Sequence, residues 1–399
     1  MRDRLLITCD ALPAPPINGH NKKVHDVMQA LSGQYAIECL IYPDTPEDFA
    51  GVRKYWAASD IKFTALRRRL SLRLLRSALT RLSLPTVTRD FEAEESVIRE
   101  RLNEGGALRV LIDYISGAPL LARFSAPQGF VFSGHDCMSY LYGEEYRYSS
   151  RLKQRLHFAI RRQFALNTER KFAHRAEVVH LVSEQDAVKL TEINPDVRTK
   201  VIPISVTIPD SAKLLPFERR VGKLVWGSLS SDLIVEGSRR FLRAVLARNP
   251  NLLEGWQFLG GVPADEAHRR LPELSESRVE YISRVDELSA HLGRTRSVFL
   301  PDISGTGQKN RMLDSLAHGC CVFGLDEVFR GVTQPATPAF VVARDYEELA
   351  GIAATEDQRA SAAMGKSGRA LMEADFSINA LRERWCDLLE KVEPIDLRA

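Results

Sequence analysis

Two glycines and then two cations occupy every second position at the start of segment 304–319, whose sequence is Ser-Gly-Thr-Gly-Gln-Lys-Asn-Arg-Met-Leu-Asp-Ser-Leu-Ala-His-Gly. A glycine pair ahead of a helix lets backbone N–H groups come close to an anion, and the helix dipole favours negative charge there. Lys309 and Arg311 add positive charge in the first turn, against the dipole, which a protein tolerates more readily where a polyanion binds. The segment predicts a phosphate-binding loop. The alternative is a strand-to-helix loop whose cations point into water.

A strand and a helix must position this loop. Residues 298–301 are apolar and precede the glycines, and Gly319 stands where a helix usually ends. Between them, four apolar residues share one helical face: Met312, Leu313, Leu316 and Ala317. We therefore expect a strand, a glycine-rich loop and a helix in succession.

A second candidate loop for an anion occupies residues 13–21, after the first apolar strand. Its prolines make it stiff, Gly19 allows close backbone approach, and Asn21 can cap the next helix. Ligands of open α/β sheets bind at such carboxyl ends of strands. The alternative is a plain proline-rich connection.

Several other chemistries lack their sequence patterns. The chain has no Asp-x-Asp, no Gly-x-Ser-x-Gly and no Walker loop, and its nine histidines do not pair at ligand spacing with cysteines or acids. We therefore expect no metal and no resident cofactor.

Composition indicates a globular protein of two domains. The chain has 399 residues, 44% hydrophobic and 27% charged, and its net charge of +3 gives no reason to expect a nucleic-acid partner. It has no apolar run near the roughly 20 residues of a membrane span and no signal-peptide pattern. None of its six cysteines forms Cys-x-x-Cys, which favours free thiols in the cytoplasm. They are Cys9, Cys39, Cys137, Cys320, Cys321 and Cys386.

Short β-rich runs alternate with helical patterns along the whole chain, which predicts parallel sheets covered by helices. The first series of expected strands is 5–9, 36–42, 110–115, 130–133, 178–182 and 201–206. The second is 224–227, 256–259, 279–282, 298–300, 321–323 and 340–342. Two series favour two Rossmann-like domains, with a break near 209–216.

Residues 65–84 hold six arginines and no acid. As a helix they would carry a leucine stripe (Leu72, Leu75, Leu79, Leu82) beside Arg69, Arg73 and Arg76, which suits an anionic membrane surface. A second basic run extends from Arg151 to Arg175. A solvated helix face is the alternative for each run. Nucleic acid fits less well, because aromatic residues are not interleaved.

The order of motifs in the second half resembles the glycosyltransferase family 4 (group 1) pattern, on the GT-B architecture of two facing Rossmann-like domains. The matching pieces are 224–229, 258–261, 279–288, 298–301, 305–314, 319–322, 340–343 and 346–349, with 182–184 and 201–203 before them. The first 170 residues match more loosely, through the Gly19 loop and His135-Asp136. The resemblance implies an acceptor-binding domain at 1–208, a nucleotide-sugar domain at 209–378, and a helix at 379–399 that returns to the first domain.

The resemblance also implies roles for single residues. Asp314 matches an acid that binds the nucleotide ribose, and Lys309 with Arg311 would meet the diphosphate. His135 matches a histidine that faces the transferred sugar. Backbone groups near the sugar or phosphate would come from Gly19, Gly227, Ser228, Gly305, Thr306 and Gly307.

Two departures from the family pattern stand out. Thr306 occupies the place of the first acid of a paired motif, and residues 228–233 hold no cation where the family usually has two. The reaction implied is retaining, metal-independent transfer of a hexosyl group to a glycan, lipid-linked or protein acceptor, as in polysaccharide synthesis, by a cytoplasmic or peripheral membrane enzyme. A non-catalytic glycan- or nucleotide-binding protein and a nucleotide-sugar epimerase remain as alternatives.

Overall fold

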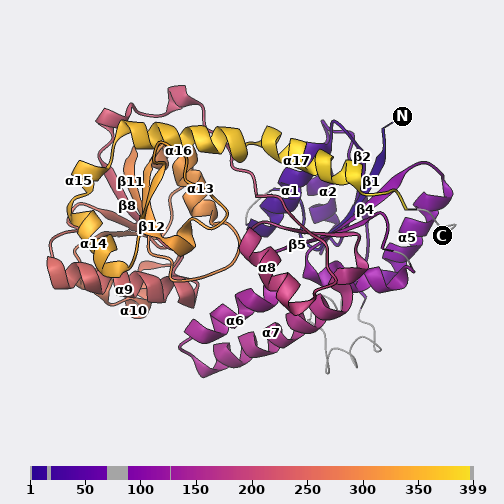
Figure 1. The fold of residues 1–399 in the computed structure, drawn as a ribbon, viewed down its shortest axis with the longest axis horizontal. Helices are drawn as coiled ribbons and strands as arrows, with labels where there is room; N and C mark the ends of the chain where they lie inside the picture. Colours follow the sequence, from indigo (N-terminus) through magenta and orange to yellow (C-terminus); the bar gives the residue numbers. More distant parts are fainter. Residues whose placement is uncertain (1, 16–18, 70–88, 126, 396–399) are drawn as a thin grey trace. The chain divides into compact units, whose positions relative to one another are not determined.

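The computed structural model describes residues 2–15, 19–69, 89–125 and 127–395. They form two compact units, each with its own sheet (Figure 1). Unit 1 comprises Met1–Gly143, Leu156–Ser205 and Ile378–Ala399, and unit 2 comprises Glu144–Arg155 and Val206–Ser377. The chain thus enters unit 2 first at Glu144–Arg155 and again after Ser205, and it returns to unit 1 at Leu156 and at Ile378.

Unit 1 is built on a sheet of seven described strands, all parallel, in the order β3-β2-β1-β4-β5-β6-β7. Parallel order requires helical crossovers, which the alternating sequence pattern predicted. The strands are β1 (Arg4–Thr8), β2 (Ala36–Ile41), β3 (Lys62–Ala65), β4 (Leu108–Asp113), β5 (Phe130–His135), β6 (Val178–Leu181) and β7 (Thr199–Val201).

Helices bury apolar residues against both faces of this sheet. One core cluster joins Met28 of α1 (Gly19–Leu31) and Trp385 of α17 (Ile378–Lys391) to Ile7 and Cys39. The opposite cluster contains Ile98 of α5. The helices before β7, apart from α1, are α2 (Pro46–Tyr55), α5 (Phe91–Asn103), α6 (Met138–Tyr148), α7 (Leu152–Phe172) and α8 (Glu184–Ile193), with 3-10 turns η1 (Ile115–Arg123) and η2 (Ala173–Arg175). The end of α6 and the start of α7 belong to unit 2.

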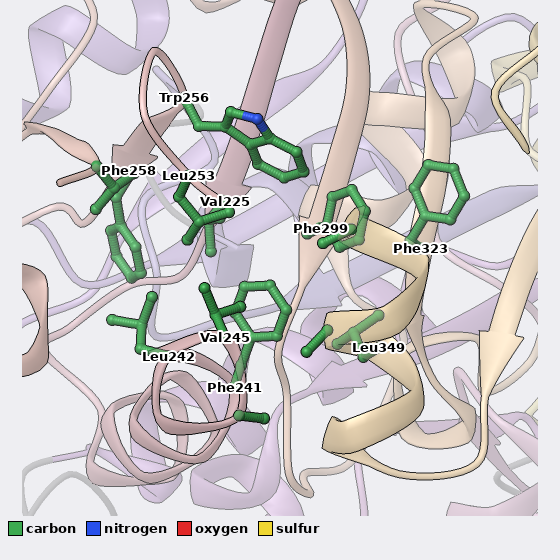
Figure 2. Close-up of a cluster of buried hydrophobic side chains, with 14 of the residues drawn as sticks. Val225, Phe241, Leu242, Val245, Leu253, Trp256, Phe258, Phe299, Phe323 and Leu349 are labelled. Carbon is green, nitrogen blue, oxygen red and sulfur yellow. The ribbon is translucent and has the colours of Figure 1, made fainter. Parts of the chain in front are cut away.

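Unit 2 has six described parallel strands in the order β10-β9-β8-β11-β12-β13. Figure 2 shows its main core, in which Phe299 stacks on Phe323 with ring centroids 4.7 Å apart and Trp256 lies 5.0 Å from Phe299. Leu242 and Leu349 close this core from two helices. The strands are β8 (Gly222–Trp226), β9 (Gln257–Leu259), β10 (Glu280–Ile282), β11 (Thr295–Leu300), β12 (Cys321–Leu325) and β13 (Phe340–Ala343).

The helices of unit 2 include a pair, α13 and α16, that packs closely. A Cβ at Gly365 of α16 would lie 2.4 Å from the carbonyl oxygen of Gly319, so the backbone of α16 meets the backbone just after α13. The helices are α9 (Asp232–Arg248), α10 (Ala264–Arg270), α11 (Glu273–Glu276), α12 (Leu288–Leu292), α13 (Asn310–Ala317), α14 (Tyr346–Ala354), α15 (Glu356–Arg359) and α16 (Ala362–Asp375). Short 3-10 turns are η3 (Ser211–Lys213), η4 (Phe217–Arg219) and η5 (Asp326–Val328).

The predicted α/β class with two parallel sheets is confirmed, and three local expectations are corrected. Strand β3 was not predicted, because its four residues carry little apolar pattern. The strand expected over 201–206 ends at Val201: Ile202 still donates to the Leu181 carbonyl, but Pro203 has no N–H to continue the ladder. The strand expected over 110–115 ends at Asp113, since Tyr114 turns to a φ of 68°.

The arginine-rich stretch at 65–84 is only partly described. Ala65 ends β3, and Arg68 forms an ion pair with Asp10 at 3.4 Å. Residues 70–88, which include Arg73, Arg76 and the leucine stripe, lie outside the described residues.

Candidate functional site

The glycine-rich loop connects β11 to α13 at the carboxyl end of the unit 2 sheet. Gly305 and Gly307 adopt φ values of 133° and 60°, which side-chain-bearing residues rarely reach. Lys309 is the N-cap residue of α13, which begins at Asn310. Arg311 lies in the first turn of the helix, as expected, whereas Lys309 precedes that turn. The glycines are therefore needed for the backbone path, as the sequence pattern indicated.

Side chains from neighbouring segments fix the shape of this loop. Arg330 donates to the Gly305 carbonyl, and the Gln308 amide donates to the Gly331 carbonyl at 3.0 Å. The Lys309 ammonium donates to the Thr306 carbonyl at 3.0 Å. These three hydrogen bonds hold the loop in place. Gln308 and Lys309 of the loop make two of them, and Arg330 from the segment after β12 makes the third.

A cavity of about 520 Å³ opens beside the loop, within unit 2. It is formed where β8, β9 and β10 end and α13 begins, the place where parallel sheets bind ligands. The described lining includes three cations, Arg284, Lys309 and Arg311, and no carboxylate. The other lining residues are Trp226, Ser228, Leu259, Gly260, Gly261, Ser283, Val285, Leu288, Gln308 and Asn310. The cavity therefore favours an anion by charge as well as by its helix terminus.

Arg311 also has a structural role in this wall. Its guanidinium donates to the Trp226 carbonyl at 2.6 Å and to Asp302 at 2.7 Å. Asp302 is 1% exposed, so its charge is balanced inside the protein by this arginine. Arg311 thus ties the end of β8 to the end of β11, which are neighbours in the sheet.

The structure brings several predicted donor-binding residues to this place. Ser228 lines the cavity. Gly227 comes just before Ser228, and a Cβ at position 227 would lie 2.7 Å from the Ile234 side chain, so only glycine fits without a shift. Gly305, Thr306 and Gly307 are buried and precede the lining residues Gln308 and Lys309, but they do not line the cavity themselves. Asp314 lies farther along α13 and is not among the lining residues; its backbone carbonyl accepts from His318 at 2.7 Å.

Some site residues were missed or only partly seen in the sequence. Arg284, Ser283 and Gly260 come from segments that were recognised as motif pieces but given no role. Arg330 lies about twenty residues beyond the loop, and no local pattern links it to Gly305. Only the tertiary structure brings these segments together.

In unit 1, His135 ends strand β5 and is 3% exposed. Its Nε2 lies 2.5 Å from a carboxylate oxygen of Asp113, which ends the neighbouring strand β4. Both His135 and Tyr114 have positive φ values, 64° and 68°, which non-glycine residues adopt at a cost. Strain on two adjacent strand ends is typical of functional sites, although the cavity that His135 lines holds only about 20 Å³, too little for a sugar.

Gly19 begins helix α1, and residues 16–18 before it lie outside the described residues. Asn21, expected as a possible cap, instead donates to the Leu12 carbonyl at 2.7 Å and ties the loop to the helix. The described residues contain no group of three or more His, Cys, Asp or Glu side chains that could hold a metal ion.

A buried ionic network that the sequence did not reveal lies near the end of β1. Arg89 and Glu94 are fully buried and joined at 3.0 Å, and Glu94 also accepts from Thr8 at 3.0 Å. Burial, together with the negative charge of Glu94, raises the pKa of the Tyr42 phenol, which donates to Glu94. The network joins the end of β1, at Thr8, to the residue after β2, Tyr42, and the loop that contains Asp10 follows β1 directly.

The comparisons with known proteins identify the fold. No family model and no curated protein matches the chain. Among solved structures, sucrose-phosphate synthase from Thermosynechococcus elongatus matches with a TM-score of 0.65 at 16% identity, covering 98% of this chain and 99% of that one. Anabaena HepE in complex with UDP matches with a TM-score of 0.62 at 15% identity, covering 97% of this chain and 99% of that one. An E. coli trehalose-6-phosphate protein bound with UDP-2-fluoro glucose matches with a TM-score of 0.61 at 13% identity, covering 98% of this chain and 100% of that one.

These neighbours share two parallel-sheet, Rossmann-like domains with this chain over nearly its whole length. At such low identity the likeness concerns the fold. The chain therefore has the GT-B fold of glycosyltransferases.

Proposed function

We propose that this protein is a retaining, metal-independent glycosyltransferase whose unit 2 binds a nucleotide-diphosphate sugar. The observation that carries the proposal is the cavity beside the β11–α13 loop, with three cations and no carboxylate in its described lining. The structural neighbours support the ligand class, since HepE was determined with UDP and the E. coli protein with UDP-2-fluoro glucose.

In the proposed reaction, the bond between the anomeric carbon and the diphosphate oxygen breaks, and its electron pair stays on the diphosphate. The Lys309 ammonium would turn from the Thr306 carbonyl to that oxygen on its flexible stem. Preorganised positive charge at a developing anion is usually the largest catalytic contribution. The acceptor hydroxyl would attack from the same face and pass its proton to the departing phosphate, which gives retention.

The other predicted residues take supporting roles in the proposal. Arg311 would align the ends of β8 and β11 and add charge beside the phosphates, while Asp314 would accept the ribose hydroxyls. Backbone groups of the loops at Gly19, Gly227 and Gly305 would face the phosphates or sugar. His135, oriented by Asp113, would contact the transferred sugar.

The acceptor would bind to unit 1 and belongs to one of three classes: a glycan, a lipid-linked molecule or a protein. One observation keeps a second function open. Thr306 replaces an acid of the family pattern and is buried, so it cannot supply that charge. A nucleotide- or glycan-binding protein without turnover would tolerate this change. A nucleotide-sugar epimerase, the third alternative, would also need an acid and a base beside the sugar.

The test is a screen of nucleotide sugars for thermal stabilisation, followed by turnover. A ligand at 100 times its dissociation constant should stabilise the folded state by ~2.7 kcal/mol. The best ligand is then incubated with and without acceptor extracts, and released nucleoside diphosphate is measured for wild type and Lys309→Met. Release that Lys309→Met lowers by on the order of 100-fold supports the proposal. Binding without release would favour the binder, and exchange between sugars would favour the epimerase.

A further inference from the structure

Helix α7 exposes a row of large apolar side chains. Leu152, Leu156 and Ile160 are 83%, 61% and 49% exposed. They are spaced four residues apart, which places them on one side of the helix over roughly 12 Å. Other large exposed apolar residues of the described chain, such as Val188 in α8 and Val221 just before β8, stand singly in separate segments. A continuous row of this kind usually marks an interaction surface.

The opposite side of α7 is already packed. Phe158 stacks on Tyr142 of α6 with centroids 6.4 Å apart, and Arg161 lies over the same ring at 5.3 Å. Figure 1 shows α6 and α7 running side by side. Ala165 is buried on this inner side as well. The exposed row is therefore not the side by which α7 contacts α6, but a second apolar face turned outward.

Positive charge lies beside the outward row. Helical geometry puts the exposed Lys153 on one flank. The exposed Arg155 lies toward the other flank, where its guanidinium stands over the Tyr146 ring of α6. Helix α7 contains six cations and a single acid, Glu169, which is buried. The surface thus combines apolar residues with cations and presents no exposed carboxylate on its own helix. We call Leu152, Leu156 and Ile160, with Lys153 and Arg155, the α7 docking face.

We propose that the α7 docking face lies in the surface of an anionic lipid bilayer. Leucine and isoleucine would enter the boundary between headgroups and acyl chains, while lysine and arginine would meet anionic headgroups. A second copy of the chain is disfavoured as the occupant, because two such faces would bring cations against cations. None of the described helices is long and apolar enough to cross a membrane, so this contact would be peripheral.

The inference is independent of turnover and of residues 65–84, whose basic stretch lies mostly outside the described residues. Its test uses the purified full chain in vesicle flotation, with phosphatidylcholine vesicles that contain or lack phosphatidylglycerol. We expect binding to the anionic vesicles, weaker binding as salt rises, and little binding to phosphatidylcholine alone. A triple variant, Leu152→Gln with Leu156→Gln and Ile160→Gln, should bind about tenfold less or weaker still.

The matched control is Val188→Gln with Val221→Gln, which removes exposed apolar residues from other elements and should leave binding unchanged. Insertion itself is read from Leu156→Trp: brominated acyl chains should quench its fluorescence beyond the quenching of wild type, which has four native tryptophans.

Three results would overturn the proposal. The first is wild type that ignores anionic vesicles at low salt, and the second is a triple variant that binds as well as wild type. The third is concentration-dependent dimerisation without vesicle binding that the triple variant abolishes, which would make a second copy the occupant.

Discussion

Replacement of Arg311 by methionine separates its structural role from a direct role in ligand binding. Arg311 joins the Trp226 carbonyl to Asp302 at 2.6 and 2.7 Å, and Asp302 is 1% exposed. Arg311→Met would keep most of the side-chain volume but leave the Asp302 charge buried without its cation. We therefore expect this variant to lower the stability of unit 2, even without ligand.

The size of the effect follows from burial. Removing one partner of a buried ion pair costs about 3–5 kcal/mol. For a domain of this size each 1 kcal/mol shifts the melting temperature by ~2–4 °C, so the expected decrease is roughly 6–20 °C. Lys309→Met removes one hydrogen bond from a half-buried ammonium and should cost about 1 kcal/mol or less.

Scanning calorimetry and urea unfolding of the ligand-free protein measure both effects. Arg240→Met is the matched control, because Arg240 pairs with Glu236 at 2.9 Å but its side chain is 51% exposed; its loss should cost under about 1 kcal/mol. The double variant Arg311→Met with Asp302→Leu should regain much of the lost stability, since an apolar pair replaces the ionic one. If Arg311→Met melts like the control yet loses nucleotide binding, the structural reasoning is wrong and Arg311 acts on the ligand.

Three further outcomes are expected. Asp314→Ala should weaken nucleoside diphosphate binding by ~1–3 kcal/mol in calorimetry, whereas unchanged affinity would leave Asp314 without a ligand role. Gly237→Ala should destabilise by ~1–3 kcal/mol in urea unfolding, because its Cβ would lie 1.9 Å from the Pro301 carbonyl oxygen; Gly51→Ala, with open space around it, is the control and should not destabilise. Burial raises the pKa of Glu169 to about 7, whereas an unfolded glutamate loses its proton near pH 4.3. The folded state therefore binds the extra proton between these pH values, and the free energy of unfolding should fall as the pH rises from about 4.3 to about 7. Glu169→Gln should remove this pH-dependent change in stability, which amounts to about 3–4 kcal/mol, and an unchanged slope would contradict the assignment.

The sequence alone determined the class of fold, because that class follows from local periodicity. Buried parallel strands appear as short apolar runs, and crossover helices must lie between them. The expected strands therefore lie close to the observed ones, except where a local event intervened. Pro203 ended a strand by lacking an N–H, and Tyr114 ended another by a turn to positive φ.

The glycine-rich loop was also predictable from sequence, since its chemistry is contiguous. Gly305, Gly307 and Lys309 lie within five residues, and their spacing before an amphipathic helix indicated an anion site. The structure gives both glycines positive φ values and makes Lys309 the helix cap.

Only the tertiary structure decided which charges balance one another. The pairing of Arg311 with Asp302 and of Arg330 with the Gly305 carbonyl depends on which strand ends become neighbours, and no local pattern encodes that. The same holds for the outward row of α7. Its sequence shows apolar residues on more than one side of the helix, and the packing of Phe158 on Tyr142 decides which side is covered and which stays exposed. Local periodicity fixes elements, whereas burial and charge balance are properties of the assembled chain.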